Sequence, residues 1–257
     1  YVVNPNGQNA LNPFFRSEVD DKEIKNHLMS TIYGELTIPQ VKGLTYRVNF
    51  NNDYIWSPHF YANQWGAGLT GEAWKEFPSI NNMTLNNILT YDRTFNEDHG
   101  LKFTLVYEYR KKNYQEFSAR GESYSDMTLG YHKLELADRR YINSGAWREK
   151  YLSQSARLNY DFQDKYLLSA TIRRDGFSGF SEKNKFGLFP SLGVGWRLSE
   201  EDFLAGIDAI NDLKVRLSYG VNGNLTSRYS SLARVSRSPS YVFGGTTVMG
   251  QHTTRSE

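Results

Sequence analysis

Hydrophobic and polar residues alternate with period two along much of the chain. Between Leu213 and Val221 every second residue is apolar, and the residues between them are Lys214, Arg216, Ser218 and Gly220. Such alternation indicates strands with one apolar and one polar face. The same pattern, in places weaker, recurs at Thr31–Ile38, Leu44–Phe50, Leu85–Phe95, Leu101–Tyr109, Leu152–Phe162, Tyr166–Arg173 and Leu188–Leu198. We therefore expect an all-β, antiparallel fold with about eight strands of roughly ten residues each.

The polar faces of these strands carry many charges. They include Arg47, Lys102, Glu108, Arg157, Arg173, Lys214 and Arg216. Strands of this length suit a tilted crossing of a bilayer, and a barrel with lipid outside and water inside requires one apolar and one polar face. A soluble sandwich with one face in solvent would show the same alternation. The strand pattern alone leaves both architectures open.

The connections expected between these strands alternate in length. Short ones fall at Gln40–Gly43, Asn96–Gly100 and Gln163–Lys165, whereas longer ones fall at Trp56–Met83, Gln115–Trp147 and Phe177–Lys185, with a polar tail from Asn224. Short periplasmic turns and long extracellular loops are typical of a transmembrane β-barrel. One segment departs from this rule, because the acidic start and apolar spacing of Glu200–Asp212 predict a short helix. Loop length thus favours the barrel.

Composition agrees with alternating faces. Of the 257 residues, 39% are hydrophobic and 15% aromatic, yet the mean hydropathy is −0.61. No apolar run reaches the length of a membrane helix, which excludes a helical membrane protein. The net charge of +2 gives no reason to expect a nucleic-acid partner. The lack of cysteine excludes disulfides, thiolate metal sites and cysteine nucleophiles.

No catalytic or metal-binding motif is present in the sequence. The five histidines are scattered without a metal-ligand spacing. Gly176–Gly179 lacks the spacing of a nucleophile elbow, and Gly193–Gly195 lacks the third glycine and the helix of a dinucleotide site. We expect no catalytic residue, no metal and no cofactor, and therefore no enzyme.

One segment favours ligand recognition. Four aromatic residues, Trp56, Tyr61, Trp65 and Trp74, lie among amide and carboxylate side chains. Flat rings next to such groups can stack on sugar faces while the polar groups bond to hydroxyls. The alternative is that these rings pack the loop onto itself or anchor it at a membrane interface. We take the four residues as candidate substrate contacts.

Two ordered motifs carry a resemblance to a known family. From Arg173 to Leu204 the chain contains R-x-D-G, then N-K-F-G-L-F-P-S, then G-W-R-L-S-E-E, and Leu213–Asn224 reads L-K-V-R-L-S-Y-G-V-N-G-N. This series resembles the late-barrel signature of the SusC/RagA family of TonB-dependent outer-membrane transporters. Arg174 departs from it, since a ring is common at that position. The resemblance implies a tight turn at Asp175–Gly176 and places Trp196 near a membrane interface.

The resemblance implies an architecture larger than this chain. Residues 1–257 would belong to the C-terminal half of one barrel domain of about 22 strands. The plug domain and the remaining strands would lie outside the chain, and the start at Tyr1 without methionine is consistent with an internal fragment.

The function implied is import across the outer membrane of a Gram-negative, Bacteroidetes-like cell. The substrate would be oligosaccharides or peptides, the partner a SusD-like lipoprotein, and the energy source the TonB complex, contacted through segments outside the chain. Outer-membrane lipid would surround the barrel. The alternatives are a passive outer-membrane porin and a soluble carbohydrate-binding β-sandwich.

Overall fold

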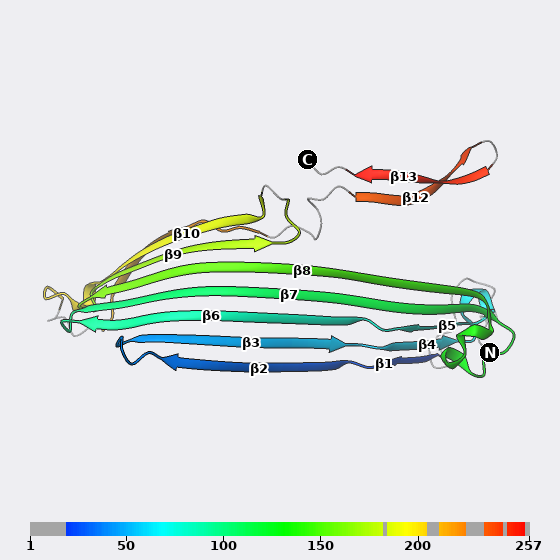
Figure 1. The fold of residues 1–257 in the computed structure, drawn as a ribbon, viewed down its shortest axis with the longest axis horizontal. Coiled ribbons are helices and arrows are strands. Elements are labelled where there is room, and N and C mark those ends of the chain that lie inside the picture. Colours follow the sequence, from blue (N-terminus) through cyan, green and yellow to red (C-terminus); the bar gives the residue numbers. More distant parts are fainter. Residues whose placement is uncertain (1–18, 182–183, 205–210, 225–233, 244–245, 255–257) are drawn as a thin grey trace. The chain divides into compact units, whose positions relative to one another are not determined.

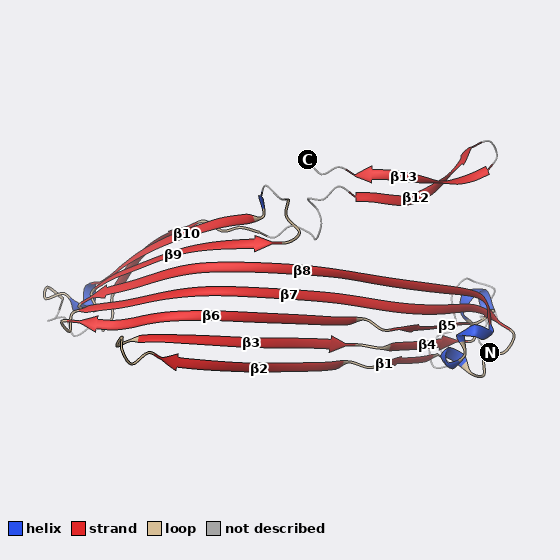
Figure 2. Ribbon diagram, in the orientation of Figure 1, coloured by secondary structure: helices blue, strands red, loops and turns tan. Residues whose placement is uncertain are grey.

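Strands make up most of the structure, a computed structural model that describes residues 19–181, 184–204, 211–224, 234–243 and 246–254 (Figure 2). The helical elements whose residues are all described are short: α1 (Gly66–Leu69) and the 3-10 helices Gly130–His132, Leu134–Leu136 and Leu198–Glu200. Within these ranges no helix has the length and apolar character needed to cross a membrane.

Eleven strands form one sheet, and two more form a separate hairpin (Figure 1). The strands are β1 (Asp20–Glu23), β2 (Asn26–Thr37), β3 (Leu44–Trp56), β4 (His59–Asn63), β5 (Glu72–Glu76), β6 (Ser79–Phe95), β7 (His99–Tyr124), β8 (Ala137–Phe162), β9 (Tyr166–Phe177), β10 (Phe186–Arg197), β11 (Lys214–Gly220), β12 (Arg234–Phe243) and β13 (Thr246–Thr254). Two strand orders meet at β7: β1-β4-β5-β7 and β2-β3-β6-β7, and both continue through β8, β9, β10 and β11.

The chain divides into two compact units. The first contains residues 1–31, 51–83 and 111–148, and the second contains residues 32–50, 84–110 and 149–257. Strands β1, β4 and β5 belong to the first unit. Strands β9, β10 and β11 belong to the second.

All eight predicted strands are present, as β2, β3, β6, β7, β8, β9, β10 and β11. The short turns are confirmed too. Residues Asn96, Glu97, Gln163 and Asp164 have positive φ, as the tightest hairpin turns require. In the turn between β2 and β3, Gly43 has φ +85°, and a Cβ there would lie 2.1 Å from the carbonyl oxygen of Asp92. Only glycine fits this position.

Several expected loops are instead strand. The segment Trp56–Met83 contains β4 and β5, and β7 and β8 run so far into Gln115–Trp147 that only residues 125–136 connect them. The polar tail contains β12 and β13, whose pairing shifts register between Arg237 and Ser240. Asp175 and Gly176 do not form a turn, because they pair with Gly187 and Phe186 inside the sheet.

The helix expected at Glu200–Asp212 is not seen in the described part of that segment. A 3-10 helix covers Leu198–Glu200, followed by turn residues up to Leu204. Residues 205–210, where most of the expected helix falls, lie outside the described residues.

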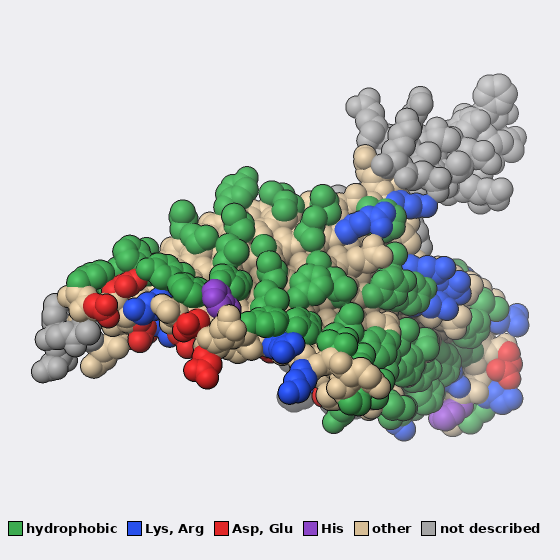
Figure 3. Space-filling view, turned by 60° about the vertical axis from the view of Figure 1, so that its left-hand side comes forward, with side chains coloured by type: hydrophobic (Ala, Val, Ile, Leu, Met, Phe, Trp, Pro, Cys, Tyr) green, Lys and Arg blue, Asp and Glu red, His purple; other side chains and the backbone are tan. Residues whose placement is uncertain are grey.

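In the second unit the two faces of the strands differ as the alternation predicts. Register pairs Leu192 with Ala170 and Tyr219, and Val194 with Leu168 and Leu217, whereas Ser191 pairs with Thr171 and Gly220. The apolar side chains are open to the surroundings: Leu217 is 74% exposed and Tyr219 is 77% exposed. Hydrophobic side chains cover much of the surface seen in Figure 3. A soluble sandwich would bury this face, so that alternative is wrong.

One end of the apolar face carries an aromatic anchor. Trp196 and Tyr166 are register partners, and their rings stack with centroids 6.4 Å apart. Trp196 Nε1 donates to Glu201 Oε1 at 2.9 Å, and the Tyr166 hydroxyl donates to the same oxygen at 2.7 Å. These hydrogen bonds hold the pKa of the Glu201 carboxyl below its usual value. Rings with an apolar body and a polar end suit a membrane interface, and the place of Trp196 at one stays a prediction.

Candidate functional site

Two of the four predicted ligand contacts come together in the first unit. Tyr61 on β4 and Trp74 on β5 are register partners, and their rings stack with centroids 5.1 Å apart and planes 11° from parallel. The edge of the His59 ring meets Trp74, with centroids 4.4 Å apart and planes at 83°. Tyr61 and Trp74 are both half-buried, so part of each ring reaches solvent. We call these three residues the aromatic platform.

The opposite face of β4 and β5 explains why the platform is fixed. There, Ala62 and Ala73 are buried under Tyr131, with Phe60, Tyr124, Met127 and Leu134 packed around them. Successive side chains of a strand point to opposite faces, so burying one set presents the other. Burial, reinforced by the nearby Asp20 carboxylate, raises the pKa of Tyr131. This small core holds the connection between β7 and β8 against the strands.

Paired charges surround the platform. Glu72 on β5 lies opposite Glu122 on β7, and Arg120 bridges them: its Nη2 is 2.6 Å from Glu72 Oε2 and 2.9 Å from Glu122 Oε1. Arg139 Nη2 lies 3.2 Å from the second oxygen of Glu122. His59 Nε2 lies 2.6 Å from Asp21 Oδ1. Most of the carboxylates around the rings therefore have cationic or imidazole partners.

The other two predicted contacts do not join the platform. Trp56, at the end of β3, is 42% exposed, and its carbonyl accepts a hydrogen bond from the Asn26 side chain. Trp65 precedes α1. Its backbone N–H donates to Asn63 Oδ1 at 3.0 Å, and its buried indole nitrogen has no hydrogen-bond partner among the described residues. Within the described ranges, neither indole forms a ring pair with Tyr61 or Trp74.

A second concave site lies in the second unit. It is a cavity of about 270 Å³ whose lining includes the rings of Tyr151, Phe177, Phe180 and Phe189. Tyr151 stacks on Phe177 with centroids 4.7 Å apart, and the Phe180 ring meets Phe177 edge-on at 5.3 Å. The guanidinium of Arg110 lies 4.0 Å above the Tyr151 ring. We call this the aromatic cavity.

Polar groups line the same cavity. Arg173 Nε donates to both carboxylate oxygens of Asp175 at 2.8 Å, and the Ser153 hydroxyl donates to Asp175 Oδ1 at 2.5 Å. Rings next to oriented polar groups can hold a flat, hydroxylated or amide-bearing ligand. The strand pattern carries a signal for this site that the sequence analysis missed. Tyr151 and Phe189 stand at positions that the alternation assigns to the polar face. Phe189 is a register partner of Arg173, and Tyr151 lies four residues before Ser155, the other partner of Arg173.

The described residues provide no metal site at the aromatic platform or at the aromatic cavity. Among the described residues, no group of three or more His, Asp or Glu side chains lies close enough together to bind a metal ion. The chemistry available at both sites is stacking, hydrogen bonding and ion pairing.

Comparison with known proteins finds relatives of one class, the TonB-dependent receptors. The chain is 30% identical over 247 residues to TonB-dependent receptor P3 of Formosa agariphila, covering 92% of the chain and 24% of that protein. It is 26% identical to TonB-dependent receptor SusC of Bacteroides thetaiotaomicron, covering 87% of the chain and 22% of that protein. The chain thus spans about a quarter of the length of these curated relatives. No family model matches it.

Solved structures share the fold. The structure of the RagAB peptide transporter matches 99% of the chain with a TM-score of 0.84 at 19% identity, and the chain covers 29% of that protein. The closed-closed state of the RagAB peptide importer matches 97% of the chain with a TM-score of 0.82.

Long antiparallel strands with an exposed apolar face and a polar face define the wall of an outer-membrane β-barrel protein. The expected fold class and location are thereby confirmed. The chain belongs to the SusC/RagA family of TonB-dependent receptors.

Proposed function

We propose that this chain is part of an outer-membrane importer that takes up oligosaccharides or peptides with energy from TonB. The observation that carries the proposal is the similarity to a TonB-dependent receptor over 92% of the chain. The strand faces support it, because a polar face opposite a lipid-facing one suits a water-filled passage. The chain has no catalytic role in this proposal.

The importer would contain more than this segment. The chain forms part of a single barrel domain, and a plug domain and further strands lie outside it. A SusD-like lipoprotein is the partner on the external side, and the TonB complex acts through segments outside the chain. The RagAB transporter, whose fold the chain shares, supports a two-part assembly.

Substrate contacts are assigned to the platform first. Tyr61 and Trp74 present stacked rings next to polar groups, which suits a sugar ring or a flat peptide side chain. Trp56, exposed at the end of β3, and Trp65, held beside α1, are secondary contacts. The aromatic cavity provides a further contact surface in the second unit.

The dependence of uptake on TonB distinguishes an active importer from a passive porin. Uptake of a labelled oligosaccharide mixture and a labelled peptide mixture is measured in cells carrying the full-length protein, with and without TonB. An active importer loses uptake when TonB is absent. Uptake that persists without TonB would identify a passive porin instead, and the substrate class is the mixture whose uptake depends on the protein.

Substitution tests the platform. Trp74→Ala in the full-length protein removes the stacking ring and leaves the core under Tyr131 intact, so uptake falls about tenfold, as expected for a lost stacking contact of roughly 1.5 kcal/mol. For comparison, Trp56→Ala removes a secondary contact outside the platform and has a smaller effect. Equal uptake by wild type and Trp74→Ala would reduce the platform to packing.

A further inference from the structure

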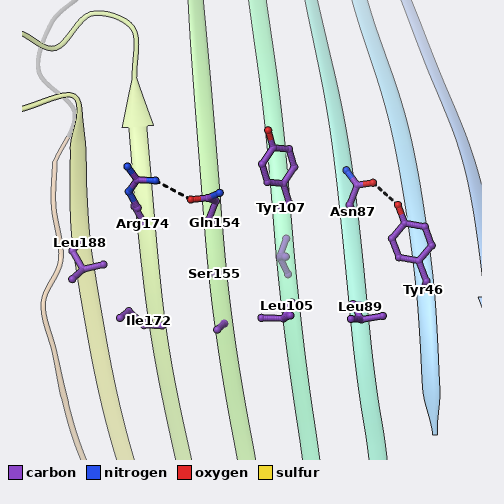
Figure 4. A pocket seen from close by; sticks show the side chains of 12 residues that line it. Tyr46, Asn87, Leu89, Leu105, Tyr107, Gln154, Ser155, Ile172, Arg174 and Leu188 are labelled. Atoms are coloured by element: carbon purple, nitrogen blue, oxygen red, sulfur yellow. Dashed lines mark hydrogen bonds between the residues drawn. The ribbon is translucent and has the colours of Figure 1, made fainter. Parts of the chain in front are cut away.

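The apolar face of the second unit contains a hollow of about 490 Å³ (Figure 4). Strands β3, β6, β7, β8, β9 and β10 contribute to its lining. Its floor is apolar and includes Leu89, Leu105, Ala156, Ile172 and Leu188. Ile172 is 48% exposed and Leu188 is 56% exposed, so the floor is open to whatever surrounds this face.

A row of polar side chains borders the floor, and we call it the polar row. It consists of Tyr46, Asn87, Tyr107, Gln154 and Arg174, which lie at one level across five strands in Figure 4. The Tyr46 hydroxyl donates to Asn87 Oδ1 at 2.6 Å, and Arg174 Nη1 donates to Gln154 Oε1 at 3.1 Å. Gln154 and Arg174 are register partners.

Arg174 is the cation of this row, and it has no anionic partner among the residues that the structure describes. Its guanidinium lies 3.7 Å from the centre of the Phe186 ring, and no carboxylate of the described residues lies within ion-pairing distance of it. The neighbouring Arg173 points to the other face and is paired with Asp175. An arginine on a lipid-facing surface is costly unless it reaches the head groups or meets an anion.

The Arg174 end of the polar row lies at the level of lipid head groups. Arg174 follows Tyr166 of the aromatic anchor by eight residues on β9, a distance of about 26 Å along a strand. With the usual strand tilt this corresponds to about 20 Å across the membrane, close to the height of an apolar band. The anchor is at the end with the short turn Gln163–Asp164, so Arg174 lies toward the end of the long connections, which is external.

These observations have one common explanation. We infer that the hollow binds a phosphate-bearing glycolipid of the outer leaflet, with its phosphate on Arg174 and an acyl chain across the apolar floor. The forked guanidinium matches a phosphate in both charge and geometry. The hydroxyl and amide groups of Tyr107 and Gln154 adjoin the same head-group position. The site is independent of transport and requires only that this face lies in a membrane.

The test uses the purified full-length protein in detergent and native mass spectrometry. The probes are bisphosphorylated lipid A, the same lipid A with its phosphates removed, and phosphatidylglycerol. Wild type binds phosphorylated lipid A in preference to both others. Arg174→Gln keeps a polar side chain but loses the charge, so its affinity for phosphorylated lipid A falls about tenfold, as expected for one charge-assisted hydrogen bond.

Arg93→Gln is the matched control. Arg93 also lies over a ring, with its guanidinium 4.9 Å from the centre of Phe95, but it stands near the short turn at the other end of β6. Its replacement leaves lipid A binding at the wild-type level. Unchanged binding by Arg174→Gln, equal binding of dephosphorylated lipid A, or a preference for phosphatidylglycerol would each overturn the inference. Uptake measured in parallel separates this outcome from a failure of the transport proposal.

Discussion

Arg120 joins two carboxylates next to the aromatic platform and offsets the repulsion between them. Its two nearest carboxylates, Glu72 and Glu122, stand directly opposite each other on neighbouring strands. Like charges in such positions repel, and the guanidinium between them turns a repulsive pair into an attractive triplet. The side chain of Arg120 is 47% exposed, so solvent and salt weaken the effect.

Arg120→Met tests this balance. We expect the strand pair β5–β7 to open more readily, by about 1 kcal/mol at low ionic strength and less at high salt. Hydrogen exchange of the amides of Glu72–Glu76 in the full-length protein measures the opening. Glu72→Gln in the same chain removes the repulsion and restores much of the protection; protection unchanged in Arg120→Met would show that the triplet contributes nothing.

Glu201 makes the aromatic anchor sensitive to acid. Its pKa is lowered by hydrogen bonds from Trp196 and Tyr166, so the charged carboxylate stabilises the folded state. This stabilisation is fully present above the ordinary carboxyl pKa of about 4.5. It is lost as the pH falls through the lowered value.

Glu201→Gln should therefore be less stable than wild type at neutral pH, and the difference should shrink in acid. The temperature at which the folded barrel loses its distinct gel mobility, followed from neutral pH down to below pH 4, measures both proteins. A difference that stays constant over this range would contradict a role for the charge. Asp202→Asn serves as the control, since Asp202 is exposed and adjacent to Glu201.

At the scale of elements, hairpin turns set which strands pair. The β2–β3 turn depends on Gly43, whose backbone is hydrogen-bonded to β6. The Asp92 N–H donates to the Gly43 carbonyl at 2.9 Å. A side chain at Gly43 would collide with the Asp92 backbone and strain a positive φ at once.

Gly43→Ala should reduce the amount of assembled protein in the membrane and destabilise it by about 1–3 kcal/mol. The control is Gly34→Ala in β2, where a Cβ meets only Val48 Cγ1 at an ordinary 3.9 Å. Quantifying the folded form on gels for both variants decides the matter. Equal assembly of the two would show that the turn tolerates a side chain.

Whether the sequence predicts a strand depends on what the two faces of that strand contact. Eight strands could be predicted because one face meets lipid and the other meets water, which leaves alternation in the sequence. Strand β4 could not, because Phe60 and Ala62 face a core while Tyr61 carries the platform, so both faces are partly apolar. In β12 the register shift beside Pro239 hides the pattern.

The candidate site was only half predictable for a similar reason. Closeness in sequence grouped Trp56, Tyr61, Trp65 and Trp74, but stacking depends on register, which pairs only Tyr61 with Trp74. The aromatic cavity joins residues from β7 to β10, and only the long-range pairing of the sheet shows that they are neighbours.

At the scale of the whole molecule, orientation in the membrane is the property to test. The short turns at Asn96–Glu97 and Gln163–Asp164 and the turn at Asp202 should face the periplasm, whereas the segment between β4 and β5 should face the outside. The chain has no cysteine, which suits single-cysteine labelling.

In cells carrying the full-length protein, Gln64→Cys should react with a membrane-impermeant maleimide and Asp202→Cys should react only after the outer membrane is opened. Both positions are exposed in the structure, so a difference in reactivity reflects the side of the membrane. The reverse labelling pattern would invert the assigned orientation, and with it the leaflet proposed for the lipid site.

Strands β7 and β8 contain 26 residues each, more than twice the number needed to cross a bilayer. The residues of β7 and β8 beyond the length needed to cross a bilayer do not form a loop. Their backbone groups are hydrogen-bonded to neighbouring strands, and this ladder resists displacement of the strands. Under the proposed import function, this part of the sheet would be a stationary frame against which other parts move. In that proposal the motion of an uptake cycle comes from the lid and the plug proposed to lie outside the chain, and cross-linking β5 to β7 should leave import intact.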